Sequence, residues 1–148
     1  MLDYLPAISI DLSLINSIRE NNKNNKIGDF FKNIFELKEK FLVSYGLSHN
    51  LSNIKEKFRI KWIMGDSGGF QVVQKAYNRP DMDISHIAPD KVLKWLENEC
   101  NAGMNLDHPP YVFSSNYESA FNDCLKNSIE NFTYFETHRS NKTLCMYN

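Results

Sequence analysis

The sequence predicts an α/β protein built on a parallel sheet. Short apolar runs that are typical of strands alternate along the chain with amphipathic segments that are typical of helices. Strands that alternate with helices are usually joined by helical crossovers, and such strands run parallel. About five strands are predicted, and in sheets of this kind the functional side chains gather just beyond the carboxyl ends of the strands.

The first half of the chain predicts three strands. A short apolar run after Pro6 predicts the first of them. After a surface loop over 20–26, apolar residues at three- and four-residue spacings predict an amphipathic helix with Asp29 in its first turn. The predicted strands of this half are 7–10, 41–45 and 60–64, and its predicted helices are 12–19, 27–37 and 50–57.

The second half predicts two more strands and two helices. After a loop over 83–86, Pro89 fits the first turn of a helix in which Trp95 packs inward, because that turn tolerates the missing N–H of proline. The predicted strands are 103–106, which is followed directly by Asp107, and 144–147. A long helix is predicted from about 116 to 136, and its apolar face consists of Phe121, Leu125, Ile129, Phe132 and Phe135.

Composition narrows the class of protein. A chain of 148 residues with 42% hydrophobic content is enough for one modest domain, and its net charge of −1 gives no overall basic field toward nucleic acid. The three cysteines, Cys100, Cys124 and Cys145, are too widely spaced for a disulfide framework or a zinc site, which fits a reducing cytoplasm. No apolar stretch approaches 18 residues, so no membrane span is expected.

The run Gly65 to Gln71, GDSGGFQ, follows an apolar strand and has two incompatible interpretations. GDSGG surrounds the nucleophile of chymotrypsin-like serine proteases, whose histidine and aspartate both precede the serine in the chain. The only histidine before Ser67 is His49, which lies in a polar stretch, and the first residues do not resemble a secretory signal. The protease interpretation is therefore rejected.

The second interpretation is a family resemblance. Residues 66–71 after an apolar strand resemble the signature of the guanine transglycosylases, (β/α)₈-barrel enzymes that exchange guanine in tRNA for a 7-deazaguanine, as in queuosine formation. The resemblance extends to residues 86–90, 106–110 and 6–9. The local sequence around Asp107 is more similar to the branch of the family that modifies DNA than to the tRNA enzymes. The resemblance implies that residues 1–148 form a single incomplete TIM (β/α)₈ barrel, its amino-terminal half with about five parallel strands.

The resemblance also implies roles for individual residues. A carboxylate accepts the paired N1 and N2 donors of guanine, and Asp107 is expected to read the base in this way. Asp66 is the expected catalytic carboxylate, which handles protons or positions the leaving base. Phe70 would stack on a base that has been turned out of its nucleic acid. The implied base-binding residues are Asp66, Ser67, Gly68, Gly69, Phe70, Gln71 and Asp107.

The family's nucleophile and zinc ligands lie in the later half of its barrel, so neither a nucleophile, a metal ligand nor a cofactor is expected in this chain. The expected partners are tRNA or DNA, guanine or a 7-deazaguanine, and either a second polypeptide that completes the barrel or a homodimer, without a membrane. The alternative function is a non-catalytic remnant that binds nucleic acid or a partner. Asp66 as a helix cap, Asp107 as a turn residue and Phe70 as a core residue stay open as plain structural interpretations.

Overall fold

The computed structural model describes residues 7–8, 33, 39–49, 53–77, 80–81, 83–109, 116–140 and 145–147. Three predicted segments lie outside the described residues: the loop 20–26, the helix 12–19 and the helix 27–37, of which only residue 33 is described. Parts of other predicted segments also lie outside them, namely residues 6, 9–10, 50–52, 110 and 144.

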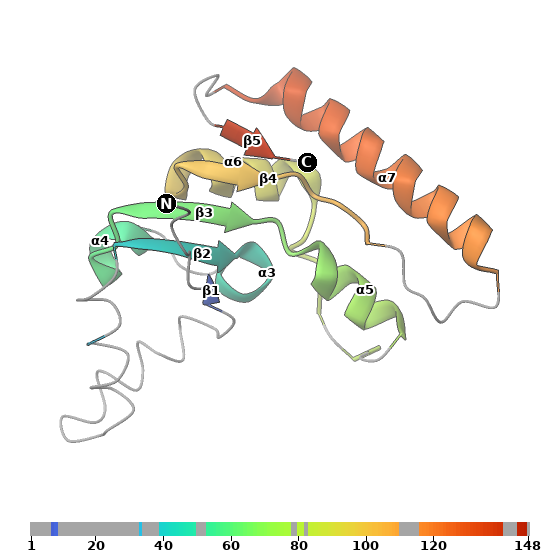
Figure 1. Ribbon diagram of the computed structural model, residues 1–148, viewed down its shortest axis with the longest axis horizontal. Helices are drawn as coiled ribbons and strands as arrows, with labels where there is room; N and C mark the ends of the chain where they lie inside the picture. The colour runs from blue at the N-terminus through green and yellow to red at the C-terminus, as the bar shows by residue number, and fades with distance from the viewer. Residues whose placement is uncertain are drawn as a thin grey trace, which may run out of the picture.

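The described chain forms a five-stranded parallel sheet whose strands follow one another in chain order. Figure 1 shows the strand arrows pointing the same way. The predicted α/β class with parallel strands is confirmed. The strands are β1 (Ala7–Ile8), β2 (Lys40–Ser44), β3 (Trp62–Asp66), β4 (Ala102–Met104) and β5 (Cys145–Tyr147). The helices are α3 (Tyr45–Ser48), α4 (Ile54–Phe58), α5 (Gly69–Tyr77), α6 (Pro89–Glu99) and α7 (Tyr117–His138).

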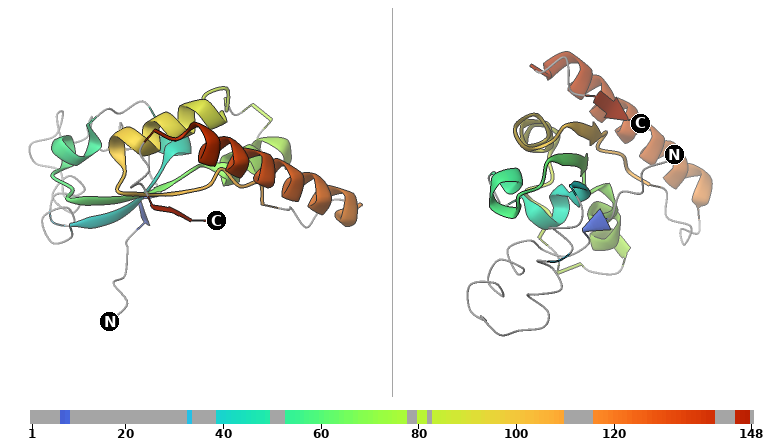
Figure 2. Two further views of the ribbon diagram at one scale, coloured as in Figure 1. Left: turned by 90° about the horizontal axis from the view of Figure 1, so that it is seen from above. Right: turned by 60° about the vertical axis from the view of Figure 1, so that its left-hand side comes forward.

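Helix α6 packs against one face of the sheet, and its buried side chains form the core with alternate residues of β2 and β3. Phe41, Val43 and Ile63 are fully buried on this face. The intervening Leu42 and Met64 are only half-buried, as expected for side chains on the opposite face. Figure 2 shows α6 and α7 on the same side of the sheet.

Two glycines bring α6 unusually close to the sheet. A β-carbon at position 65 would lie 2.4 Å from Leu96 Cδ2 and 2.7 Å from Cys100 Sγ, and one at position 103 would lie 2.9 Å from Leu96 Cδ2. Because Gly65 and Gly103 are also paired in the sheet, Leu96 lies over a strip without side chains. The helix therefore takes the space that larger residues would fill.

A buried acid begins the short helix α4. Glu99, at the end of α6, is 8% exposed, and its two carboxylate oxygens accept from the backbone N–H groups of Asn53 and Ile54 at 2.8 and 2.9 Å. The first N–H groups of a helix have no partner within it, and a negative charge there is favourable. Glu99 thus joins α6 to α4 and caps α4 in place of its own N-cap residue.

The structure differs from the prediction at the ends of three strands. Strand β4 ends at Met104 and not at the predicted Leu106, and β3 continues to Asp66, two residues beyond its predicted end. Tyr45, predicted as the last residue of a strand, instead begins α3, and a nine-residue helix, α5, begins inside the glycine-containing motif at Gly69 where no helix was predicted. The predicted apolar face of α7 is present but largely uncovered, because Phe135 is fully buried whereas Phe121, Leu125 and Ile129 are 42 to 56% exposed. No helix in the described part of the chain combines the length and apolar character that a membrane crossing needs.

Candidate functional site

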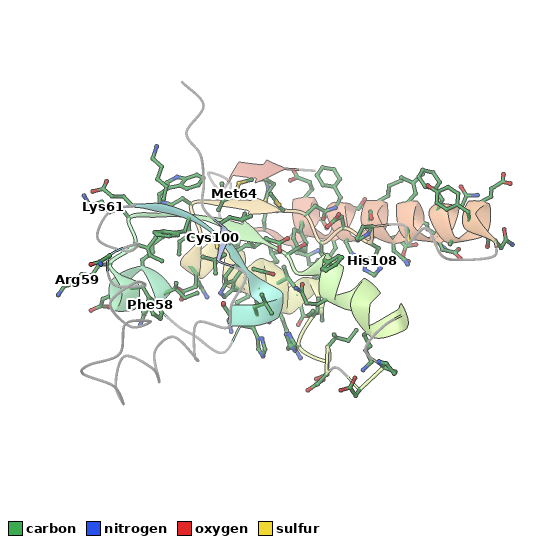
Figure 3. The ribbon with its side chains drawn as sticks, turned by 60° about the horizontal axis from the view of Figure 1, so that its bottom comes forward. Phe58, Arg59, Lys61, Met64, Cys100 and His108 are labelled. Carbon is green, nitrogen blue, oxygen red and sulfur yellow. The ribbon has the colours of Figure 1, made fainter. Side chains whose placement is uncertain are left out.

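The predicted site residues lie at one edge of the sheet, at the carboxyl ends of β2, β3 and β4. Asp66 is the last residue of β3 and pairs across the sheet with Ser44, the last residue of β2. Asp107 follows the end of β4 by three residues. Figure 3 shows His108, the next residue, at the opposite end of the strands from Phe58, Arg59 and Lys61.

The glycines of the motif bring these strand ends together. A β-carbon at position 69 would lie 2.0 Å from the backbone oxygen of Asp107 and 3.0 Å from its Oδ1. Gly68 has φ +87°, in the left-handed region that favours glycine, and a β-carbon there would lie 2.8 Å from the backbone nitrogen of Gly46. Thus the backbone of Gly46 and Asp107 already takes the space beside Gly68 and Gly69. The implied role of these glycines in binding the base stays a prediction.

The two predicted acids are close enough for their charges to interact. Partial burial is the largest influence and raises the pKa of the Asp107 carboxyl, while a backbone hydrogen bond opposes part of this rise. The charge of neighbouring Asp66 raises the pKa by a smaller amount, and His108 lowers it slightly. The residue as a whole remains exposed, so its carboxyl is only partly shielded from water. Two carboxylates from neighbouring strands therefore share this rim, and a group that donates hydrogen bonds to Asp107 would relieve its loss of hydration.

Four buried polar atoms at the same rim have no hydrogen-bond partner among the described residues. They are the hydroxyl oxygens of Ser44 and Ser67, Gln71 Oε1 and Asn105 Oδ1. Ser67 is fully buried, and Ser44 and Asn105 are 8% and 6% exposed. More than about nine in ten buried polar groups in proteins have a partner. A polar ligand seated at this rim would gain hydrogen bonds that these groups do not make within the chain.

Phe70 is not a core residue. Its exposed fraction is 52%, although it opens the first turn of α5 directly beside the buried Gly68 and Gly69. An exposed aromatic ring that directly follows Gly69, whose backbone approaches Asp107, is suited to stacking on a flat molecule. The plain structural interpretation of Phe70 as a core residue is therefore wrong.

The segment that carries Asp107 is held by polar residues of α7 that the sequence analysis did not select. Ser128 accepts from His108 N through its Oγ at 2.9 Å and from Asn105 Nδ2 through its backbone oxygen at 3.1 Å. Asn131 Nδ2 donates to Leu106 O at 2.8 Å. Polar residues on the inward side of an otherwise apolar helical face were the available signal. These hydrogen bonds attach the segment after β4 to helix α7.

His108 is half-buried beside α7, and burial lowers its pKa below that of a free histidine, with the nearby Asp107 charge opposing the shift. Its side chain is therefore neutral at pH 7. It lines a pocket of about 280 Å³ together with residues of α5, α6 and α7. None of the predicted site residues lines that pocket.

A larger pocket of about 400 Å³ lies between the end of β4 and α7. Asp107 and Asn105 line it, but none of the predicted residues 66–71 does. The predicted residues are thus divided between a shallow rim, where the two acids meet, and a pocket on the α7 side of Asp107. In the described part of the chain, no three histidine, cysteine, aspartate or glutamate side chains are grouped as a metal ion requires.

Comparisons of the chain with protein-family models, with curated proteins and with solved structures find no match. The function has to be argued from the rim itself.

Proposed function

We propose that the rim at the ends of β2, β3 and β4 binds a guanine-type base, and that the chain is the amino-terminal part of a (β/α)₈ barrel of the guanine transglycosylase kind. Parallel strands in chain order support the barrel, because doubly wound sheets instead reverse their strand order at a switch point. The position of α6 and α7 on one side of the sheet supports it too, since barrel helices all lie outside.

The observation that carries the base-binding proposal is the shared rim of Asp66 and Asp107 with its unpartnered buried oxygens. Guanine and 7-deazaguanine present N1–H and an exocyclic NH₂ on one edge, which matches the two oxygens of a carboxylate. Asp107 is assigned to that edge because two donors would offset the hydration that its partly buried carboxylate has lost. Phe70 supplies an exposed ring for stacking, a contact worth about 1–3 kcal/mol per base.

In this proposal Asp66 is the catalytic carboxylate. It lies one strand away from Asp107 and faces Ser44 across the sheet, so it reaches the part of a bound base that Asp107 does not hold. Its chemistry would be proton transfer to or from the base as the base leaves or enters. Gln71 and Ser67 would serve as additional hydrogen-bonding groups beneath the base.

The test measures binding of 7-deazaguanine by isothermal titration calorimetry, with adenine as the comparison base. Adenine has an acceptor at N1 and cannot donate a pair of hydrogen bonds to a carboxylate. Asp107→Asn should weaken 7-deazaguanine binding roughly 10- to 100-fold, the value of a charged hydrogen bond of about 1.5–3 kcal/mol. Asp90→Asn, at an exposed acid in the first turn of α6, is the matched control and should leave binding unchanged.

Equal affinity for adenine and 7-deazaguanine, or wild-type affinity in Asp107→Asn, would refute the proposal. Exchange of labelled guanine into tRNA or DNA is the second measurement, and it separates catalysis from binding. Selective base binding without exchange would assign the chain to the non-catalytic alternative.

A further inference from the structure

Helix α7 presents a continuous apolar row to the outside. Its members are four residues apart and therefore lie along one side of the helix. Single exposed apolar residues are common on proteins, whereas a contiguous row of large ones marks an interaction surface. This row, called the α7 ridge below, consists of Tyr117, Phe121, Leu125 and Ile129, with exposed fractions of 49, 42, 48 and 56%.

The α7 ridge leads into the 400 Å³ pocket at the end of β4. Leu125 and Ile129 belong to the ridge and also line the pocket, so the two form one surface. Met104 and Phe132 make the rest of its apolar lining. A partner whose apolar side chains lie on the ridge could therefore place an adjacent side chain in the pocket.

Two of the three polar residues that line the pocket, Asn105 and Asp107, offer hydrogen-bond acceptors to an occupant, and the third is Ser128. Asn105 uses its Nδ2 to donate to Ser128 O, and its Oδ1 has no partner in the part of the chain that the structure describes. Asp107 adds a carboxylate. An unpartnered buried acceptor costs about 1–3 kcal/mol, so the occupant that fits best brings a hydrogen-bond donor.

The charges beside this surface are acidic. Glu118 is exposed at the amino end of the α7 ridge, and Asp107 lies at its other end. Lys126, the lysine of α7, flanks Ile129 as Glu118 flanks Phe121, three residues away on the helix, but its charge is offset by Glu130, whose Oε1 lies 3.9 Å from Lys126 Nζ. In a dimer formed through this surface, the ridge of one copy would face the ridge of the other, and the acidic residues beside the two ridges would repel each other. A basic partner complements them.

We propose that the α7 ridge and its pocket are the docking surface for a basic amphipathic helix of a protein partner. The apolar face of that helix lies on the ridge, and one of its lysine or arginine side chains enters the pocket to donate to Asn105 Oδ1 and the Asp107 carboxylate. The ridge runs from Tyr117 to Ile129, a rise of 12 residue steps or roughly 18 Å, which is about three turns of a partner helix. The inference does not require the proposed base-binding function, but both assign the Asp107 carboxylate as an acceptor, so a bound base and the partner's lysine or arginine would compete for it.

The test uses three synthetic 18-residue helical peptides with leucines four residues apart, measured by fluorescence anisotropy. The first carries arginines beside the leucines, the second has the central arginine replaced by norleucine, and the third carries glutamates. The arginine peptide should bind, the norleucine peptide at least tenfold more weakly, and the glutamate peptide not measurably. Ile129→Glu should abolish binding, whereas Ser119→Glu, which adds the same charge away from the ridge, should not change it.

Both substituted side chains are exposed, so circular dichroism and thermal melts should match the wild type. Ile129→Glu should also keep its affinity for 7-deazaguanine, which distinguishes a failure of this inference from a failure of base binding. Absence of binding by the arginine peptide up to about 1 mM would overturn the proposal. The proposal would also be overturned if the wild type formed a homodimer that Ile129→Glu disrupts. Binding to neutral phosphatidylcholine vesicles that Ile129→Glu abolishes would overturn it as well.

Discussion

Substitution of Gly69 by alanine tests how tightly the ends of β3 and β4 are joined. An added methyl group would lie 2.0 Å from the backbone oxygen of Asp107, whereas ordinary contacts begin near 3.4 Å, so the two segments must separate by 1.4 Å. Because the obstacle is backbone, rotation of a side chain does not relieve it. Overpacking of this kind costs about 1–3 kcal/mol.

The sign of the effect makes the test sharp. Gly69 is the first residue of α5, and helix propensity alone would make alanine more stable than glycine by up to about 1 kcal/mol. The contact with Asp107 predicts the opposite, a melting temperature lowered by roughly 2–12 °C. Calorimetry and urea denaturation measure both the temperature and the free energy of unfolding.

Gly46→Ala is the matched control. The three nearest atoms to its β-carbon would all belong to the Gln71 side chain, from Oε1 at 2.6 Å to Cγ at 2.9 Å, and a side chain can rotate away where backbone cannot. The control should lose less than about 1 kcal/mol of stability. A Gly69→Ala protein as stable as the wild type, or more stable, would refute the close approach of the two strand ends.

Three further predictions concern the core, the rim and the cysteines. Glu99→Ala should lower the free energy of unfolding by about 1.5–3 kcal/mol in urea denaturation, because two backbone N–H groups lose a charged partner; Asn98→Ala, at an exposed neighbour, should not. Because the folded-state pKa of Asp107 is raised, the native chain holds more protons than the unfolded chain between the two pKa values, and stability falls as pH rises through that window. Asp107→Asn should therefore be more stable than the wild type at pH 7, with the difference disappearing below about pH 4, and an unchanged pH profile would contradict this. Burial raises the pKa of the Cys100 thiol, so iodoacetamide followed by mass spectrometry should modify Cys100 only after unfolding.

The strands and α6 were predictable because their signals are local. The run that became β3 is apolar and bounded by polar residues, and Pro89 marks the first turn of α6, whose Trp95 is buried as expected. The expectation that Asp66 and Asp107 share one edge followed from parallel strands, and their charge interaction agrees with it.

The remaining features depend on contacts between distant residues. Helix α5 was missed because the pair Gly68–Gly69 is typical of a loop, and only the approach of Asp107 explains why glycine stands at its first position. The cap of α4 was missed because Glu99 and Ile54 are 45 positions apart. Periodicity predicted an apolar face on α7 but carries no information on which part of that face another element covers.

The bare strip beneath α6 has a consequence for how this sequence can change over time. Leu96 occupies the volume that side chains at positions 65 and 103 would need, so the three positions are not independent. The three nearest atoms to a methyl group at position 103 all belong to Leu96, so that change becomes tolerable once position 96 has become smaller, whereas a methyl group at position 65 would also lie 2.7 Å from Cys100 Sγ and 2.8 Å from a Trp95 ring carbon. Descendants of this chain should thus keep Gly65, and they should replace Gly103 only after the leucine has been lost.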